Sequence, residues 1–105
     1  MSIEGLEYRV IEVCRGWGLY EDENASDRTR FNKLKEEVAE LEEALFQDQT
    51  LVHIQMEAGD VLVTLINILY KKGLDLNYCL DAAYMKIKDR KGKMIDGCFV
   101  KEEDL

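Results

Sequence analysis

The amino-acid sequence predicts an all-α fold, a single four-helix unit resembling a bundle, that spans residues 1–105. Proline, the strongest helix breaker, is absent from the chain. Four separate stretches carry apolar residues at intervals of three or four, which is the spacing of one helix face. No internal repeat or linker interrupts them, so we expect one domain. A chain of this size has a small core, which favours a dimer or a higher oligomer.

The first predicted helix runs from Ile3 to about Arg15, with acidic residues such as Glu7 at its polar positions. Glycines flank Trp17, and the polar stretch 21–30 predicts a loop before the next helix. Trp17 is a candidate for stacking on a nucleobase, although a single tryptophan more often belongs to a core or an interface.

The second predicted helix starts at Thr29 or Phe31 and ends at Gln47, in a stretch rich in Glu, Leu, Lys and Ala. Its apolar stripe is narrow. Along one edge of that stripe lie Lys33, Glu37, Glu40 and Ala44. Glu36 points further outward on the same helical wheel.

The third predicted helix, His53 to Lys71, is apolar around most of its circumference and should therefore be central. Burying each of its aliphatic side chains would contribute roughly 1.5 to 3 kcal/mol. One polar stripe remains, formed by His53, Glu57, Asp60, Thr64, Asn67 and Lys71. An unpaired carboxylate is costly in such a helix, so we expect a cation to face this stripe.

A fourth helix is expected from a cap at Asp75 or Asn77 to about Arg90. Lys86 and Arg90 lie one turn apart on it. Glycines then end the helical pattern, and we expect the tail to pack locally through its apolar residues, which are Met94, Ile95 and Phe99.

Composition narrows the class of protein. The formal charge of -8, from 22 acidic and 14 basic residues, argues against binding to duplex nucleic acid. The three cysteines form no C-x-x-C pair, which favours reduced thiols in the cytoplasm. A Cys–His nucleophile is formally possible but disfavoured. No signal peptide is recognisable and the longest apolar run is too short to span a bilayer, so we expect a soluble protein that does not enter membranes.

Two predicted helices each carry acidic residues three positions apart, which are Glu37 with Glu40 and Glu57 with Asp60. If the helices pack antiparallel, both pairs meet across the interface. Four carboxylates at close range repel one another unless a multivalent cation neutralises them, and oxygen ligands suit Mg²⁺ or Mn²⁺. A solvated acidic face, or acids that favour the start of a helix, would produce the same pattern without a metal ion.

His53 is the only histidine in the chain. A carboxylate-bridged di-iron bundle normally needs an E-x-x-H motif on two helices, and this chain has none. His53 is within reach of Glu57, four residues later, but a lone histidine at a helix start is more often a surface or capping residue.

A close resemblance to the MazG-like, all-α nucleoside triphosphate pyrophosphohydrolases is carried by two segments, KLKEEVAELEEAL and EAGDVLVTLINIL. Together they match the family's E-E-x-x-E and E-x-x-D signature, and the likeness to small single-domain members extends from about Phe31 to Asp104. The resemblance implies Mg²⁺-dependent cleavage between the α and β phosphates, which converts a nucleoside triphosphate to the monophosphate and pyrophosphate. It also implies a dimer or a tetramer.

The resemblance assigns roles to individual residues. The metal ligands would be Glu37, Glu40, Glu57 and Asp60. Glu36 would hold a further metal ion or orient the attacking water. Lys33 and Asn67 would contact phosphate, sugar or base, and Lys86 with Arg90 would meet the triphosphate, sometimes across a subunit interface.

Lys33 and Asn67 could equally be ordinary salt-bridging or polar residues. Lys86 and Arg90 could instead form a solvated basic face near a helix C-terminus. The competing functional interpretation of the whole chain is a non-catalytic helical module that binds a nucleotide or a protein. The converging carboxylates disfavour it, since a pure binding module does not need them.

Overall fold

Four α-helices make up most of the chain, which the computed structural model describes from residue 1 to residue 105. In chain order these helices are α1 (Ile3–Gly16), α2 (Asp27–Glu43), α3 (Leu51–Lys71) and α4 (Leu76–Ile87). An antiparallel hairpin of β1 (Gly92–Ile95) and β2 (Cys98–Lys101) follows, and a 3-10 turn, η2 (Glu102–Asp104), ends the chain. The all-α prediction with four helices is confirmed.

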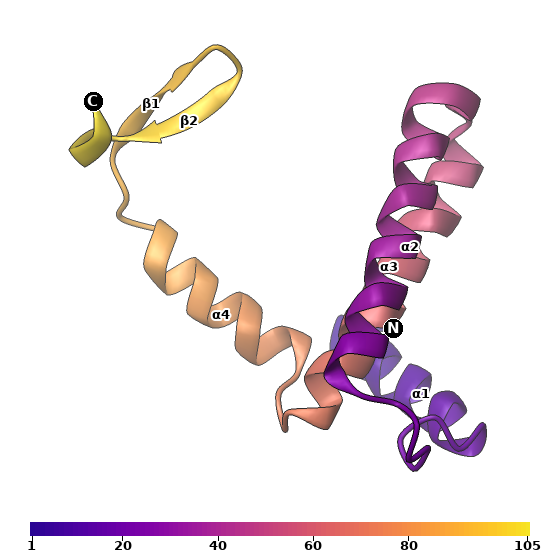
Figure 1. Ribbon diagram of the computed structural model, residues 1–105. Helices are drawn as coiled ribbons and strands as arrows, with labels where there is room; N and C mark the ends of the chain where they lie inside the picture. Colours follow the sequence, from indigo (N-terminus) through magenta and orange to yellow (C-terminus); the bar gives the residue numbers. More distant parts are fainter.

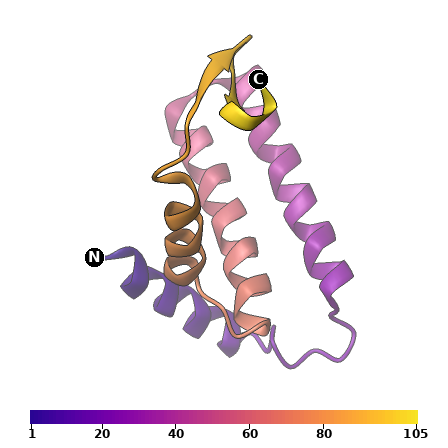
Figure 2. The same cartoon turned by 90° about the vertical axis from the view of Figure 1, so that its left-hand side faces the viewer.

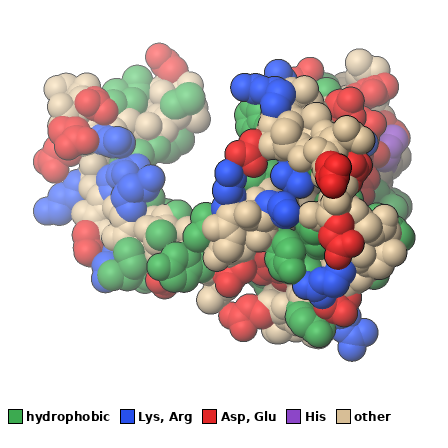
Figure 3. Space-filling model, turned by 60° about the horizontal axis from the view of Figure 1, so that its bottom comes forward, with side chains coloured by type: hydrophobic (Ala, Val, Ile, Leu, Met, Phe, Trp, Pro, Cys, Tyr) green, Lys and Arg blue, Asp and Glu red, His purple; other side chains and the backbone are tan.

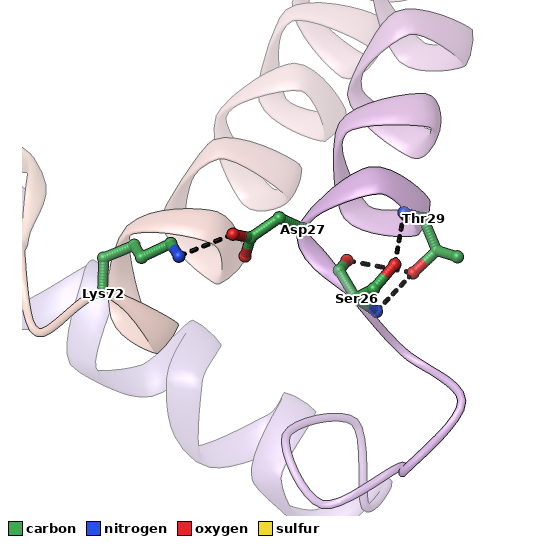
Figure 4. A network of polar contacts seen from close by, with 4 residues as sticks. All are labelled: Ser26, Asp27, Thr29 and Lys72. Carbon is green, nitrogen blue, oxygen red and sulfur yellow. Dashed lines mark hydrogen bonds and ion pairs between the residues drawn. The ribbon is translucent and has the colours of Figure 1, made fainter.

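Helices α2 and α3 lie side by side and antiparallel (Figure 1). The start of α2 is tied to the end of α3 by Lys72 Nζ, which lies 2.6 Å from Asp27 Oδ2 (Figure 4). The helix begins before the predicted Thr29 because Ser26 and Thr29 form a capping box, in which each side-chain oxygen accepts from the other's backbone N–H. Threonine replaces the usual Glu or Gln at the third position of this box, which is why the sequence pattern did not reveal it.

A π-helical turn, η1 (Ala44–Asp48), follows α2. The turn closes where the N–H of Gln49, in the left-handed conformation with φ 60°, donates to the carbonyl of Ala44 over 2.7 Å. Helix α3 then starts at Leu51, two residues before the predicted His53. The wide turn directs Asp48 toward the first turn of α3, where it contacts His53.

Helix α1 crosses the lower end of the α2–α3 pair and packs on α3 (Figure 1). The loop after α1 brings Tyr20 against α3, where its ring stacks at a centroid distance of 4.3 Å on Tyr70. The Tyr20 hydroxyl donates to Asn67 Oδ1 over 2.6 Å, and Lys71 Nζ donates to the Tyr20 carbonyl over 2.9 Å. Cys14, Tyr20, Ala44 and Ile66 are the only buried apolar residues, so the core of a single chain is small.

Helix α4 and the hairpin form an arm, residues 76–105, that runs away from the α2–α3 pair (Figure 1). Figure 2 looks onto the arm, which lies in front of α3. The arm starts at a buried carboxylate: Glu7 Oε2 accepts from the Leu76 N–H over 2.9 Å, while Asp75 caps the helix through the Tyr78 N–H. Glu7, expected at a polar surface position, is only 5% exposed because it has this role.

The hairpin corrects the expectation for the tail, which predicted no strands. Asp96 and Gly97, with φ of 50° and 81°, form the two-residue turn that an Asp-Gly pair favours between antiparallel strands. Met94 pairs with Phe99 across the hairpin, but the two side chains remain 65% and 48% exposed. The tail therefore packs only on itself and covers none of the helices.

The single chain is extended and leaves apolar side chains uncovered. Its radius of gyration is 16.6 Å, whereas a compact chain of this length has about 13 Å. The accessible surface is 8235 Å², against roughly 6,100 Å² for a compact protein of 12.2 kDa. Figure 3 shows the chain as two lobes, the arm and the part formed by α1, α2 and α3, with open space between them.

Helix α3 has the length and hydropathy of a membrane-spanning helix, with 21 residues and a mean hydropathy of 1.3. These properties are weak evidence, because the core helix of a soluble protein shares them. Insertion would take Glu57 and Asp60 to membrane depth at a cost of about 2.5 to 3.5 kcal/mol each. Within the single chain only 11% of this window is buried, so its apolar side chains are largely uncovered.

Candidate metal centre

Four carboxylates meet between α2 and α3. One carboxylate oxygen from each of four residues lies within 4.8 Å of the other three, and these residues are Glu37, Glu40, Glu57 and Asp60. Each helix contributes two acids three positions apart, and the antiparallel packing sets the two pairs face to face. The structure thus brings together all four predicted metal ligands, which we call the acidic cluster.

Two oxygens of the acidic cluster are buried without a partner. Glu37 Oε2 and Glu57 Oε2 accept no hydrogen bond, although the side chains are only 9% and 15% exposed. Leaving such an acceptor unpaired costs about 1 to 3 kcal/mol, and more when it is charged. Glu40 and Asp60 are exposed, so the cluster opens to solvent on one side. A set of oxygen ligands with an open side fits Mg²⁺ or Mn²⁺, which keep waters or substrate phosphates in their coordination shell.

Crowding within the acidic cluster favours the protonated form of Glu40. A hydrogen bond with Glu37 and the negative charge of Glu37 raise the pKa of Glu40, and Glu57 raises it to a smaller extent. Lys33 Nζ offsets part of this charge at 3.2 Å from Glu37 Oε1, a contact that raises the pKa of Lys33. One lysine cannot balance four carboxylates, so the cluster favours additional positive charge.

Glu36, the predicted catalytic acid, lies outside the acidic cluster. Its side chain is 66% exposed and faces Lys33 Nζ at 3.4 Å. This placement agrees with the helical wheel, which turns Glu36 outward. Its catalytic role stays a prediction.

A cavity of about 340 Å³ lies beside the cluster, between the loop after α1 and helices α2 and α3. Its lining includes the predicted substrate residues Lys33 and Asn67, together with Trp17, which is 73% exposed rather than part of a core. Asn67 is buried and its Oδ1 is occupied by Tyr20, so its amide N–H₂ is the group left to donate.

Arg30 also lines this cavity, and its Nε is buried without a partner. The sequence does not single out Arg30, because it lies at the boundary between the predicted polar loop, 21–30, and the predicted second helix. Its position three residues before Lys33, on what proved to be the first turns of α2, was the available signal.

Lys86 and Arg90 lie elsewhere, on the arm. They line a separate cavity of about 580 Å³ with charged residues of both signs, including Asp89 and Lys101. Basic side chains are visible on this lobe in Figure 3, across open space from the helices. Within one chain, the structure does not bring Lys86 and Arg90 to the acidic cluster.

His53 touches the acidic cluster from outside. Its Nε2 lies 3.3 Å from Glu57 Oε1, and its Nδ1 is in close contact with Asp48 Oδ2 from the π-helical turn. The contact with Asp48 raises the pKa of His53 and lowers that of Asp48. Asp48 was expected only in a short link, because the sequence does not reveal a π-helical turn.

A comparison with protein families shows which family the chain belongs to. Residues 15–86 match the family model described as phosphoribosyl-ATP pyrophosphohydrolase. The chain belongs to this family. The match contains all four acids of the cluster and leaves the hairpin outside. Comparisons with curated proteins and with solved structures gave no match.

Membership in the phosphoribosyl-ATP pyrophosphohydrolase family, a relative of the MazG-like superfamily, makes the chain a hydrolase that releases pyrophosphate from nucleotide-like substrates. It also agrees with the helical architecture and with an acidic cluster suited to a divalent metal ion.

Proposed function

We propose that the chain is a Mg²⁺-dependent nucleoside triphosphate pyrophosphohydrolase of the small MazG-like type, which converts a ribo- or deoxyribonucleoside triphosphate to the monophosphate and pyrophosphate. The observation that carries this proposal is the acidic cluster, with two buried and unpaired carboxylate oxygens, beside a cavity of nucleoside size. The family match, to a pyrophosphohydrolase, supports a reaction that releases pyrophosphate.

The acidic cluster would hold Mg²⁺, with Mn²⁺ as the alternative, through Glu37, Glu40, Glu57 and Asp60. Bound there, the ion would polarise the phosphoryl oxygens and lower the pKa of a coordinated water. Lys33 stands between this cluster and the adjoining cavity, so its ammonium can bind a phosphate oxygen. We propose that Glu36, next to Lys33, orients the attacking water.

The nucleoside would occupy the cavity of about 340 Å³. Asn67 can donate its amide to the sugar or the base, and the Trp17 ring provides an exposed surface for stacking. The unpartnered Nε of Arg30 provides a further donor in the same cavity.

We also propose that two chains assemble into a homodimer, which can pair again into a tetramer. The surface beyond that of a compact chain is about 2,100 Å², within the range of about 1,000 to 2,500 Å² per chain that obligate dimers bury. An apolar groove of about 720 Å³ between α3 and α4, lined by side chains such as Leu62, Leu65 and Leu80, would receive the second copy.

Dimerisation would give Lys86 and Arg90 a role that one chain cannot provide. On the projecting arm, they are placed to reach a triphosphate bound at the partner's acidic cluster and to stabilise its developing charge. The net charge of -8 supports a soluble protein that does not bind duplex nucleic acid. A cytoplasmic location is proposed from the three cysteines, which form no C-x-x-C pair.

A second candidate substrate is phosphoribosyl-ATP, which the family description favours. This molecule carries a second sugar phosphate on the nucleotide, whereas the cavity is near the lower end of the usual range of about 300 to 1,000 Å³. The cavity therefore fits a simple nucleoside better. The non-catalytic binding module remains as the outcome in which no substrate is hydrolysed.

The test is a pyrophosphate-release assay with a panel of ribo- and deoxyribonucleoside triphosphates and phosphoribosyl-ATP, with Mg²⁺ or with EDTA. We expect nucleoside triphosphates to be hydrolysed only with the metal. Glu40→Gln and Asp60→Asn should each lower the rate at least about 100-fold, because they remove a ligand rather than an outer contact. Glu43→Gln, which changes an exposed acid one turn further along α2, is the matched control.

The outcomes separate the candidates. Hydrolysis of phosphoribosyl-ATP alone would favour the second substrate, and no pyrophosphate from any compound would favour the binding module. Full activity in both variants, with unchanged helical circular dichroism, would refute the metal assignment.

A further inference from the structure

Asp48, His53 and Glu57 form a chain of contacts that ends at the acidic cluster. Asp48 is the last residue of the π-helical turn, and His53 and Glu57 lie one turn apart on α3. The His53 ring lies between the two carboxylates, with Nδ1 toward Asp48 Oδ2 and Nε2 3.3 Å from Glu57 Oε1. Each ring nitrogen faces a carboxylate oxygen, so both contacts are hydrogen bonds when both nitrogens donate.

The two oxygens of Glu57 have different surroundings. Oε1 faces His53, whereas Oε2 is buried and has no hydrogen-bond partner. A carboxylate held through one oxygen has little freedom to rotate, so its other oxygen keeps a fixed direction. Glu57 is one of the four acids whose oxygens converge.

We infer that His53, oriented by Asp48, is a positioning residue that holds Glu57 Oε1 and so presents Oε2 to a divalent cation in the acidic cluster. This inference rests on the proposed function, since it requires that the cluster binds a metal ion. His53 touches neither the metal nor the substrate. Carboxylate–histidine contacts outside a metal site commonly change metal affinity or activity 10- to 100-fold.

A purely structural role is the competing interpretation, because the Asp48 contact also joins the π-helical turn to α3. The two roles use different ring nitrogens. In the structural role the Nδ1 contact with Asp48 matters, whereas in the positioning role the Nε2 contact with Glu57 is decisive. Substitutions that imitate one nitrogen or the other can therefore separate them.

The experiment measures Mn²⁺ affinity by the electron paramagnetic resonance signal of free Mn²⁺, with thermal unfolding recorded in parallel. The amide nitrogen of His53→Gln can occupy the place of Nε2, and that of His53→Asn the place of Nδ1. We expect His53→Asn to bind Mn²⁺ about 10- to 100-fold more weakly and His53→Gln to retain most of the affinity. Lys72→Ala, which breaks an exposed ion pair with Asp27 far from the cluster, should bind as the wild type does.

Asp48 provides a further check. Asp48→Asn should weaken Mn²⁺ binding when His53 is present and should have no further effect in a His53→Ala background, because Asp48 acts only through the ring. The inference about His53 would be wrong if His53→Asn bound Mn²⁺ as the wild type does, or if His53→Gln bound it more weakly than His53→Asn. Either result would leave the proposed metal site standing. If the wild type itself fails to bind Mn²⁺, both the inference and the proposed metal site are refuted.

Discussion

The α2–α3 pair and the arm are incomplete in opposite ways. The pair is capped by Ser26, tied at its open end by Asp27 and Lys72, and contains the buried Glu37 and Ile66, but it carries unpaired carboxylate oxygens. In the arm, backbone N–H and C=O groups form helix and hairpin hydrogen bonds, but α4 contains no buried residue. The pair therefore lacks positive charge, whereas the arm lacks an apolar partner.

The arm should show the largest effect, because its apolar surface has no cover within the chain. Leu80, 65% exposed, lies in the groove between α3 and α4. We expect Leu80→Glu to convert the proposed dimer to a monomer, since burying a leucine contributes about 1.5 to 3 kcal/mol and the change occurs in both copies. Sedimentation equilibrium measures the change in mass.

Asp81→Asn is the control for this variant, because it alters the neighbouring exposed residue of α4 without adding charge to the groove. It should remain a dimer. Pyrophosphate release should fall in Leu80→Glu but not in Asp81→Asn, since Lys86 and Arg90 would no longer reach the partner's cluster. A Leu80→Glu protein that stays dimeric would show that the groove is not the interface.

A substitution within the part formed by α1, α2 and α3 should have a smaller effect, on stability, and should leave assembly unchanged. Tyr20 donates to Asn67 Oδ1, and burial of the tyrosine raises the pKa of Tyr20 to about 12, so the donor proton is present at ordinary pH. Tyr20→Phe should lower the free energy of unfolding by about 0.5 to 1.5 kcal/mol. Urea denaturation measures this loss, and Tyr8→Phe, at an exposed tyrosine of α1, should have no effect.

In the α2–α3 pair, the sequence predicted that four acids converge, because their placement depends on local spacing. Helical spacing put Glu37 with Glu40 and Glu57 with Asp60 on one face each, the short connection favoured antiparallel packing, and the structure brings the two pairs together. Asp48 and Arg30 were not recognised, because their roles depend on a π-helical turn and on an unusual capping box. Both are backbone features that residue periodicity does not encode.

The arm shows where the sequence was least informative. The limits of α4 were predicted within three residues of its observed end, but its direction depends on Glu7, a contact between residues far apart in the chain. The hairpin was missed although Asp96–Gly97 is a recognised turn signal, because its short strands follow a helix and were interpreted as a packed tail. Long-range placement of the arm is a tertiary property that helical spacing does not predict.

The smallest expected effect is a change in stability on replacing Glu40. It shows whether Glu40 destabilises the α2–α3 pair through its charge or stabilises the pair through its contacts. Glu40 has a raised pKa because of Glu37, so the folded state binds its proton more tightly than the unfolded state, and stability falls as pH rises above the usual glutamate range near 4.3. Without metal, Glu40→Gln should therefore unfold at a higher temperature than the wild type at about pH 7.5. This difference should shrink as the pH falls through the usual glutamate range toward about pH 4, because the raised pKa of Glu40 matters only where the unfolded state has lost the proton.

Saturating Mg²⁺ should reverse that order. A ligand at 100 times its dissociation constant stabilises the folded state by about 2.7 kcal/mol, and the wild type gains this while Glu40→Gln gains less. Glu43→Gln should follow the wild type with and without Mg²⁺ at both pH values. If Glu40→Gln proves less stable than the wild type near neutral pH without metal, Glu40 stabilises the helix pair, and the cluster does not need a cation to balance its charge.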